Sequence, residues 1–441
     1  MSFSVYIDLE VKKRDMHSRL LVGAVILKRL PDAKIYIGRR LPGWIIGWLL
    51  KPDVVIRKNT RMSGMSTVTR LKASGVNVVN IDEEGIVYGD LNTLIRHSYP
   101  EKMVANTDLH FIAGSALFER LKESYPEHEC KFKLVGNPRT ALWSEGYFGY
   151  FDRQVDELKH RWGEYILISS NFPMVSNEQA GRESRHSAGN LEGSANLEHY
   201  LAELSRAKKI YHSFIDLVEF LCASGKRVII RAHPVDSIDV LMRDFNHPMV
   251  SIVTDSQSFP WLSNCICLIH NGCTTSIEAK IMGIPTIAYC KDNLRRQIPD
   301  RLNIASDCIA TSEHEVLIYL ENKGQSELKN WNSELLEPAV NFDVIVEELI
   351  SFKTNRDISV AREKFFKSLN ALNFNFLKIY RIIVSKFSAT KKARLKVIEA
   401  KFPETKKAEL ETFLECCRRR IGCDKKFKVS NLGPNVFRIG H

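Results

Sequence analysis

Short apolar runs alternate with amphipathic stretches from the start of the chain to about residue 330, and this alternation constrains the fold more than any other feature. The predicted strands of the first half are residues 5–9, 33–37, 53–56, 76–81, 110–113 and 132–135. Those of the second half are residues 165–169, 227–231, 250–253, 265–269 and 286–289. Strands that alternate with helices form parallel, doubly wound sheets. The chain is therefore predicted to be an α/β protein with two Rossmann-like domains that face a cleft.

The predicted domain boundaries follow changes in this pattern. Residues 1–155 form the first Rossmann-like domain, and residues 160–340 form the second. Within the second domain, residues 172–197 are polar and are predicted to be a long loop. Residues 341–387 are predicted to be helices that return to the first domain, and residues 388–441 a basic helical tail.

The overall charge points to an anionic partner. The chain has 63 Lys and Arg against 52 Asp and Glu, which gives a net charge of +11. Such a balance suits nucleic acid, an anionic membrane face or an acidic sugar nucleotide, and it does not choose among them.

Cysteine usage and hydropathy bear on metal binding and location. The ten cysteines are scattered and form no Cys or His pairs at zinc spacing, so we expect no metal site and a reducing compartment. The first residues do not resemble a signal peptide, and the apolar run at residues 44–50 is too short to span a bilayer. We therefore expect a cytoplasmic protein.

The most informative segment follows the predicted strand at residues 265–269. Gly272 allows a tight turn, and Gly283 would end the following helix. Thr275 and Glu278 fit a capping box, which places the helix start at Thr275. The free N–H groups of a helix start suit a nucleotide phosphate, although a plain strand–turn–helix gives the same pattern. The predicted phosphate ligands are Asn271, Gly272, Thr274, Thr275 and Ser276.

A second candidate follows the predicted strand at residues 227–231. Pro234 stops this strand, so His233 would lie at its carboxyl end. A histidine there can donate to a phosphate oxygen or protonate it as it leaves. Arg231 is a further phosphate candidate. The alternative is a histidine bonded to backbone in a turn.

Three acids follow the predicted strand at residues 76–81. They are Asp82, Glu83 and Glu84, and Gly85 comes next. Like charges at one strand end repel one another, which can raise the pKa of one acid toward that of a useful base. An acid here could deprotonate an acceptor hydroxyl. The alternative is a solvated acidic turn.

Weaker candidates come after two other strands. Glu10, Arg14 and Arg19 could bind an acceptor or a sugar carboxylate, and a solvated helix start is the alternative. Asn171 could contact a nucleotide. The chain has no P-loop, G-x-S-x-G or H-E-x-x-H motif, and no G-x-G-x-x-G follows a strand, which disfavours an ordinary NAD enzyme.

Taken together, three of these motifs resemble the signature of bacterial sialyltransferases. The resemblance rests on Glu83-Glu84-Gly85, His233-Pro234 and Thr275-Ser276, in this order. It implies that Glu84 is the base and that His233, Thr275 and Ser276 hold the phosphate of CMP.

More of the chain resembles the bacterial surface carbohydrate biosynthesis protein family, up to about residue 330. The matching stretches are residues 10–21, 36–39, 82–85, 136–139, 169–172 and 270–286. That family is similar to retaining β-Kdo transferases, which implies the GT-B fold, with an acceptor domain first and a donor domain second. These enzymes use a carboxylate nucleophile, for which Asp236 is a candidate by position alone.

The resemblance implies a glycosyltransferase of surface polysaccharide biosynthesis, such as O-antigen or capsule. It would transfer an ulosonic acid such as Kdo from a CMP-sugar to a glycan hydroxyl. A single phosphate needs little charge compensation, so neither a metal nor another cofactor is expected. Glu84 would act as base if the configuration inverts. In a retaining reaction one carboxylate would attack the anomeric carbon. The sequence does not choose between them.

Several alternatives remain open at this stage. The donor could be a UDP-sugar or CDP-glycerol, or the chain could be a non-catalytic glycan- or nucleic-acid-binding protein. The basic tail could lie against the anionic inner membrane, where lipid-linked acceptors reside, or pack on the core as a helical cap.

Overall fold

The computed structural model describes residues 3–10, 12–58, 60–81, 91–181, 194–233, 235–254, 257–291, 306–322, 336–337, 339–354, 363–368, 406–432 and 435–441. The chain divides into two compact units. The first unit comprises Met1–Tyr150 and Asn332–His441, and the second comprises Phe151–Trp331. The observed boundaries between the units lie close to the predicted domain boundaries at residues 155–160 and 340.

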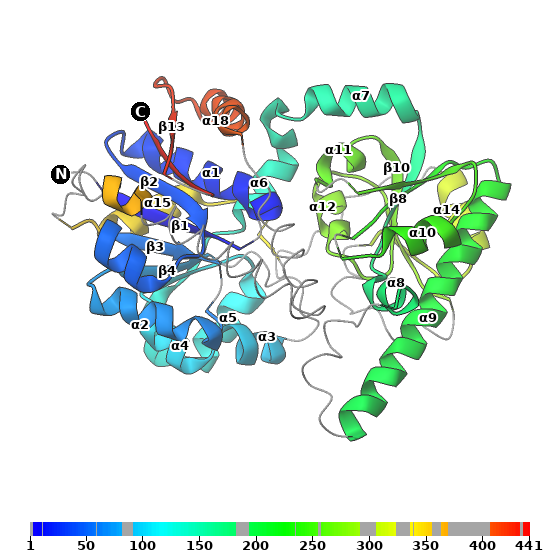
Figure 1. Cartoon of the computed structure of the whole chain (residues 1–441), viewed down its shortest axis with the longest axis horizontal. Helices are drawn as coiled ribbons and strands as arrows, with labels where there is room; N and C mark the ends of the chain where they lie inside the picture. Colours follow the sequence, from blue (N-terminus) through cyan, green and yellow to red (C-terminus); the bar gives the residue numbers. More distant parts are fainter. Residues whose placement is uncertain are drawn as a thin grey trace. The chain divides into compact units, whose positions relative to one another are not determined.

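The first unit is built on one eight-stranded sheet (Figure 1). Its strands are β1 (Ser4–Leu9), β2 (Lys34–Arg39), β3 (Val54–Arg57), β4 (Asn77–Ile81), β5 (Leu109–Ile112), β6 (Phe132–Leu134), β13 (Lys428–Asn431) and β14 (Val436–Gly440). Their order is β13-β14-β2-β1-β3-β4-β5-β6. The pairs from β2 to β6 are parallel, and every residue of β1 is buried, as is typical of a central strand in a doubly wound sheet.

Helices cover this sheet. They are α1 (Lys12–Arg29), α2 (Met65–Ala73), α3 (Leu91–Ser98), α4 (Glu101–Asn106), α5 (Ser115–Ser124), α6 (Pro138–Ser144), α15 (Phe342–Ser351) and α18 (Lys407–Ile421). Short turns of other helix types are η1 (Ile45–Leu50), η2 (Met62–Gly64), η4 (Pro126–Lys131) and η5 (Gly146–Gly149). Gly136 has φ +81°, and the Ala339 carbonyl oxygen would lie 2.6 Å from a Cβ there, so a larger residue would block the returning chain.

The prediction of a helical tail for residues 388–441 holds for α18 and is wrong for residues 428–441, which belong to the first sheet, while residues 388–405 lie outside the described residues. β14 pairs antiparallel with β2, and β13 pairs antiparallel with β14. In Figure 1 the red end of the chain lies beside the blue β2 and α1. Val436, Phe437 and Ile439 are at most 3% exposed. The helical prediction followed the basic charge of this region, and the five residues of β14 do not alternate clearly between buried and exposed positions.

Some of the basic residues of α18 have partners within the chain. Arg418 donates to both carboxylate oxygens of Glu415, at 2.7 and 2.8 Å, and to the Cys423 carbonyl at 2.9 Å. Arg420 forms an ion pair of 2.5 Å with Glu145. The Arg420–Glu145 pair attaches α18 to the segment after α6, and membrane contact through the tail stays a prediction.

Part of the predicted helical return at residues 341–387 is described. α15 packs on α1, and the backbone N–H of Thr354 donates to Asp53 at 2.8 Å. Residues 363–368 include one helical turn whose Phe366 is fully buried. Residues 355–362 and 369–387 lie outside the described residues.

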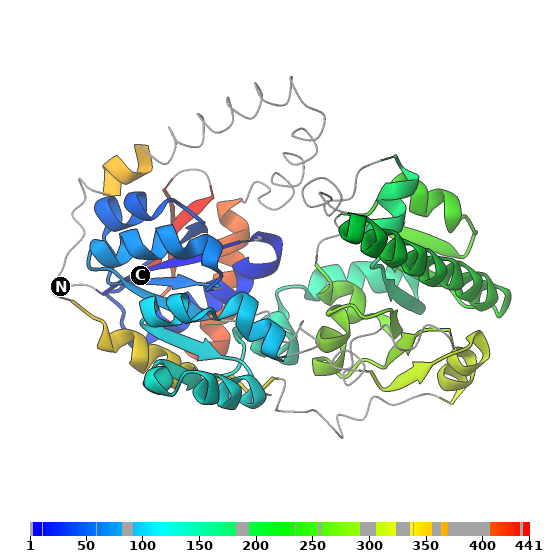
Figure 2. The same ribbon diagram turned by 90° about the horizontal axis from the view of Figure 1, so that it is seen from below.

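The second unit is a parallel six-stranded sheet with helices around it (Figures 1 and 2). Its strands are β7 (Tyr165–Ser169), β8 (Val228–Arg231), β9 (Val250–Val253), β10 (Cys265–His270), β11 (Thr286–Tyr289) and β12 (Cys308–Ala310). Its helices are α7 (Asp152–Trp162), α8 (Pro173–Gln179), α9 (Ser194–Ala223), α10 (Ile238–Asp244), α11 (Phe259–Leu262), α12 (Thr275–Ile281) and α14 (Glu313–Glu321). The strand order is β12-β11-β10-β7-β8-β9.

The predicted long loop at residues 172–197 is wrong at both of its ends. α8 starts at Pro173, where proline suits the first turn of a helix, and α9 starts at Ser194. The core behind α8 is aromatic: Phe172 makes edge contacts with Tyr211 and Phe214. None of the helices in the described part of the chain combines the length and apolarity needed to cross a membrane.

Candidate functional site

A buried carboxylate holds the turn after β8, which carries His233. Asp236 accepts hydrogen bonds from the Ser170 hydroxyl at 2.5 Å and from the His233 N–H at 2.9 Å. Its other carboxylate oxygen accepts from the Ser176 hydroxyl at 3.1 Å. Burial raises the pKa of Asp236, and the hydrogen bond from Ser170 opposes that shift. Asp236 therefore ties the end of β7 and the helix α8 to the His233 turn.

These contacts bear on the predicted role of Asp236 as a nucleophile. Both of its carboxylate oxygens already accept hydrogen bonds, and the residue is 7% exposed. The arrangement favours a positioning role, and attack by Asp236 on a sugar stays a prediction.

Replacement of Asp236 by alanine is expected to destabilise the second unit. The change leaves the buried Ser170 and Ser176 hydroxyls without this acceptor, at about 1–3 kcal/mol for each, while the His233 N–H keeps its hydrogen bond of 2.7 Å to Ser170 Oγ. We expect the unfolding free energy, measured by urea denaturation, to fall by about 3 kcal/mol or more. The control is Ser224→Ala, at an exposed hydroxyl, with a change below about 0.5 kcal/mol. Equal stability of the two variants would contradict the assignment.

The hydrogen bond that His233 accepts determines which of its ring nitrogens can act as a donor. Its side chain is exposed, and its Nδ1 accepts a hydrogen bond of 3.3 Å from the Val235 N–H. In a neutral ring the proton is therefore on Nε2, which makes that atom a donor. Arg231 ends β8 and is half-buried. Pro234 lies outside the described residues.

The segment between β10 and α12 lies close to the end of β7. The Ser169 hydroxyl donates to Thr275 Oγ1 at 3.2 Å and lies 3.4 Å from Cys273 Sγ. Gly272 has φ 97°, which confirms that this turn needs a residue without a Cβ. The structure thus joins the end of β7 to the start of α12 by side-chain contacts.

The predicted capping box is wrong. α12 starts at Thr275 as expected, but no side chain caps it, and Glu278 instead accepts a hydrogen bond from the Ser258 hydroxyl. The Ser276 hydroxyl donates to the Cys273 carbonyl at 2.8 Å, so a phosphate would have to compete for it. The glycine at the other end is confirmed, because Gly283 has φ 72° and directly follows Met282, where the helix ends.

Strand order explains why these groups belong together. β8 and β9 extend to one side of β7, and β10 to β12 extend to the other, so the chain changes direction at β7 and β10. In open α/β sheets, ligands bind at the carboxyl ends of the strands at such a switch point. Asn171 and Thr274 are exposed there, and Asn271 is half-buried.

His270 is a structural residue of this turn. It is fully buried at the end of β10, where Nδ1 accepts from the Gly272 N–H at 3.1 Å and Nε2 lies 2.9 Å from Ser306 Oγ. Burial lowers the pKa of His270 to about 4, so the ring is neutral near pH 7.

The first unit has charged groups at its own switch point, where β2 and β3 lie on either side of β1. Lys58, at 1% side-chain exposure, lies 3.3 Å from Glu10 and 3.7 Å from Asp15. Arg57 lies 3.9 Å from Asp8, and burial lowers the pKa of Arg57. Arg57 and Lys58 carry no local sequence signal of a site, because nothing in the apolar run before them shows that their charges are buried.

The remaining predicted residues of the first unit are only partly described. Arg19 is fully buried and its guanidinium lies 3.5 Å from the carbonyl of Ile81, the last described residue before the acidic motif. The motif residues Asp82, Glu83, Glu84 and Gly85 all lie outside the described residues. Arg14 lies in α1, and its side chain is outside the description.

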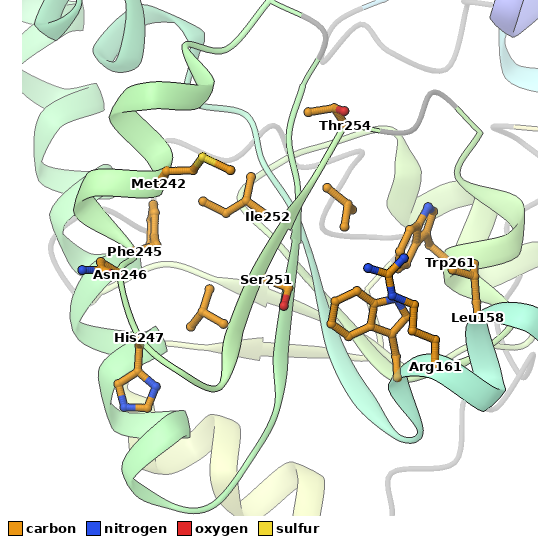
Figure 3. Close-up of a pocket in the computed structure, with 13 residues that line it drawn as sticks. Leu158, Arg161, Met242, Phe245, Asn246, His247, Ser251, Ile252, Thr254 and Trp261 are labelled. Carbon is orange, nitrogen blue, oxygen red and sulfur yellow. The ribbon is translucent and has the colours of Figure 1, made fainter.

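A separate pocket of about 650 Å³ lies along β9, at one edge of the second sheet (Figure 3). In Figure 3, Met242 and Phe245 line one side of β9, and Arg161 and Trp261 line the other. The lining residues within the described chain include none of the predicted site residues. The switch point, where polar groups from three strands converge, is therefore the better candidate site.

The described residues contain no group of three or more His, Cys, Asp or Glu side chains placed to hold a metal ion. The expectation that the reaction needs neither a metal nor another cofactor stays a prediction.

Comparison with known proteins gives a fold but no family. The sequence matches no protein-family model and no curated protein. A UDP-GlcNAc 2-epimerase from Methanocaldococcus jannaschii is 14% identical, with 80% of this chain and 100% of that chain covered and a TM-score of 0.51. S. aureus MnaA, in a co-structure with UDP, is 12% identical, with 79% and 96% covered and a TM-score of 0.51. UDP-GlcNAc 2-epimerase from Neisseria meningitidis, bound to UDP-GlcNAc, is 12% identical, with 80% and 100% covered and a TM-score of 0.50. At such identities the likeness establishes the fold alone, and this chain has the GT-B fold.

Proposed function

We propose that this chain is an enzyme of surface carbohydrate biosynthesis that binds a nucleotide sugar at the switch point of its second unit. The observation that carries the proposal is the convergence at the end of β7. Ser170 and Asp236 hold the turn of His233 on one side, and Ser169 contacts Thr275 on the other. A phosphate placed there would meet the Nε2 donor of His233 and the start of α12.

Within this proposal the reaction is transfer of an ulosonic acid from a CMP-sugar to a glycan hydroxyl. Two features support a CMP donor. The His233-Pro234 and Thr275-Ser276 pairs resemble sialyltransferase motifs. One guanidinium, Arg231, and one imidazole donor, Nε2 of His233, lie at the described end of β8, which suits one phosphate better than two. Glu84 or Glu83 would act as the base if the configuration inverts.

A UDP-sugar is the second candidate ligand. It is favoured by the solved structures of the same fold that hold UDP or UDP-GlcNAc. The switch point would bind phosphate in both proposals. The identity of the nucleotide that binds therefore distinguishes a CMP-sugar from a UDP-sugar.

We expect CMP to raise the melting temperature of the protein in a thermal-shift panel with CDP, UDP and UDP-GlcNAc. Loss of the His233 donor in His233→Ala should weaken CMP binding about tenfold or more, because a hydrogen bond to a charged group contributes about 1.5–3 kcal/mol. The matched control is His247→Ala. His247 is also exposed and its Nδ1 also accepts a backbone N–H two residues on, at 3.1 Å.

The possible outcomes separate the proposals. Stabilisation by UDP or UDP-GlcNAc but not by CMP would replace the ulosonic donor by a UDP-sugar. A failure of every nucleotide, together with salt-sensitive binding to random DNA, would favour the non-catalytic nucleic-acid-binding alternative. An equal loss of CMP binding in both histidine variants would contradict the assignment of His233 as a phosphate ligand.

A further inference from the structure

Two tryptophans of the first unit lie on its surface in an otherwise buried apolar segment. The segment has the sequence Trp-Ile-Ile-Gly-Trp-Leu-Leu at residues 44–50. Trp44 is 46% exposed and Trp48 is 66% exposed. The five other residues of the segment, Ile45, Ile46, Gly47, Leu49 and Leu50, are buried. Two large aromatic side chains exposed four residues apart in one segment form an apolar surface of the kind that marks interaction sites.

The segment holds both tryptophans rigidly. Residues 45–50 form a turn of π-helix, a rare conformation that is frequent at functional sites. Gly43 and Gly47 face α2 so closely that a Cβ at either position would meet Thr67 or Ser74 at 2.7 Å. Trp44 and Trp48 each follow one of these glycines, so they project from a backbone that is locked onto α2.

The surrounding chain is cationic. Residues 33–81 contain nine Lys and Arg, namely Lys34, Arg39, Arg40, Lys51, Arg57, Lys58, Arg61, Arg70 and Lys72. The one acid in this range, Asp53, is fully buried and accepts hydrogen bonds from Ser4 and Thr354. Arg70 is exposed, and its Cβ would lie 3.3 Å from a Cβ on Gly43. Arg57 and Lys58 are buried, and Arg40 and Lys72 pair with Asp8 and Asp108. The exposed positive charge beside the tryptophans is therefore that of Arg70, with the half-buried Lys51 directly after the segment.

We propose that the Trp44–Trp48 face of the first unit docks on an anionic membrane surface. Tryptophan rings prefer the headgroup level of a bilayer, because one part of the ring is apolar and the N–H is polar. Neighbouring lysines and arginines are attracted to anionic lipid headgroups. The protein would lie on the membrane surface through these two aromatic anchors.

Charge argues against a second copy of the chain as the occupant. A two-fold symmetric dimer brings the same patch of both subunits together. On this face it would bring the exposed Arg70 of both subunits together, which is unfavourable. A lipid surface supplies both the apolar layer and the negative charge.

The test uses the full chain and two kinds of vesicle. We expect binding to vesicles of phosphatidylcholine with about one-third phosphatidylglycerol, and little binding to phosphatidylcholine alone. Trp44→Ser with Trp48→Ser should weaken vesicle binding about tenfold or more. Brominated lipids should quench tryptophan fluorescence in the wild type and much less in this double variant. Arg70→Glu should weaken binding severalfold and should increase the effect of added salt.

Two controls match the double variant. Leu201→Ser with Ile318→Ser removes two side chains of similar exposure, 52% and 57%, from the second unit, and should bind like the wild type. A variant with Arg419, Lys425 and Lys426 replaced by serine tests the basic tail without removing core residues. Loss of binding in the tail variant alone would overturn the proposal. So would wild-type binding by the double tryptophan variant, or conversion of a dimer to a monomer in it.

Discussion

Removal of residues 428–441 is expected to unfold the first unit, although the deleted segment is a basic chain end. The segment forms the β13–β14 hairpin, which adds two strands to the sheet at β2. Its apolar side chains are at most 5% exposed, namely Val429, Leu432, Val436, Phe437 and Ile439. The loss of the hairpin would also expose Ile35 and Ile37, which pair with it.

The expected loss is as large as the stability of a whole domain. Burial of a large apolar side chain contributes about 1.5–3 kcal/mol, so five of them contribute roughly 8–15 kcal/mol. Typical domains are stable by about 5–15 kcal/mol. The shortened chain should therefore lack the native first unit at any temperature.

Hydrogen exchange measured by mass spectrometry can check this unit by unit. Backbone amides of β1 and β2 should exchange as fast as in an unfolded chain, while those of β7 and β8 stay protected. Lys428→Ala, on the same hairpin but exposed, is the control, with a change below about 0.5 kcal/mol. Slow exchange of β2 in the shortened protein would show that the hairpin is dispensable.

The same hairpin shows what local sequence patterns miss. The predicted strands up to residue 289 coincide with observed strands within one or two residues, because fully buried parallel strands have dense apolar runs. β14 has only five residues and joins β2 across about 400 residues of chain, and such long-range pairing leaves no local signal. β12, with three residues, was missed because it is too short to form a pattern.

The candidate site was predictable in its position but not in its contacts. Pro234 and Gly272 mark strand ends, and this placed His233 and Thr275 correctly after β8 and β10. The role of Ser170 depends on the neighbouring positions of β7 and β8, which strand order decides. Glu278 matches a capping box in sequence, yet its carboxylate accepts a hydrogen bond from the hydroxyl of Ser258, which is 20 residues away in the chain. Local patterns therefore located the strand ends, and tertiary contacts determined the hydrogen bonds made there.

The fold should lose stability as the pH falls below about 6.5, because each unit buries a neutral histidine. His110 in β5 is fully buried between Tyr99 and Phe132. Burial, reinforced by the charge of Lys131, lowers the pKa of His110 to about 3. The pKa of His270 in the second unit is lowered to about 4 by burial.

The sign follows from proton binding. Between pH 6.5 and the folded-state pKa, the unfolded chain binds a proton that the folded chain does not. The contribution of each buried histidine to the unfolding free energy is therefore fully present above pH 6.5 and decreases as the pH is lowered. The slope is about 1.4 kcal/mol per pH unit for each histidine, so His110 and His270 each account for a loss on the order of 3 kcal/mol by pH 4. Burial also lowers the pKa of His17 to about 4, which adds to the loss in the first unit.

Single replacements can assign this loss to each histidine. His110→Phe keeps a ring of similar size between Tyr99 and Phe132, and should make the first unit less sensitive to pH between 6.5 and 4 without changing the second. His270→Gln should do the reverse. Urea midpoints of each unit, followed by hydrogen exchange at several pH values, report both. All other titrating groups are common to the three proteins, so the difference in slope isolates each ring. A wild-type slope in His110→Phe would mean that His110 is already protonated in the folded protein, against the burial argument.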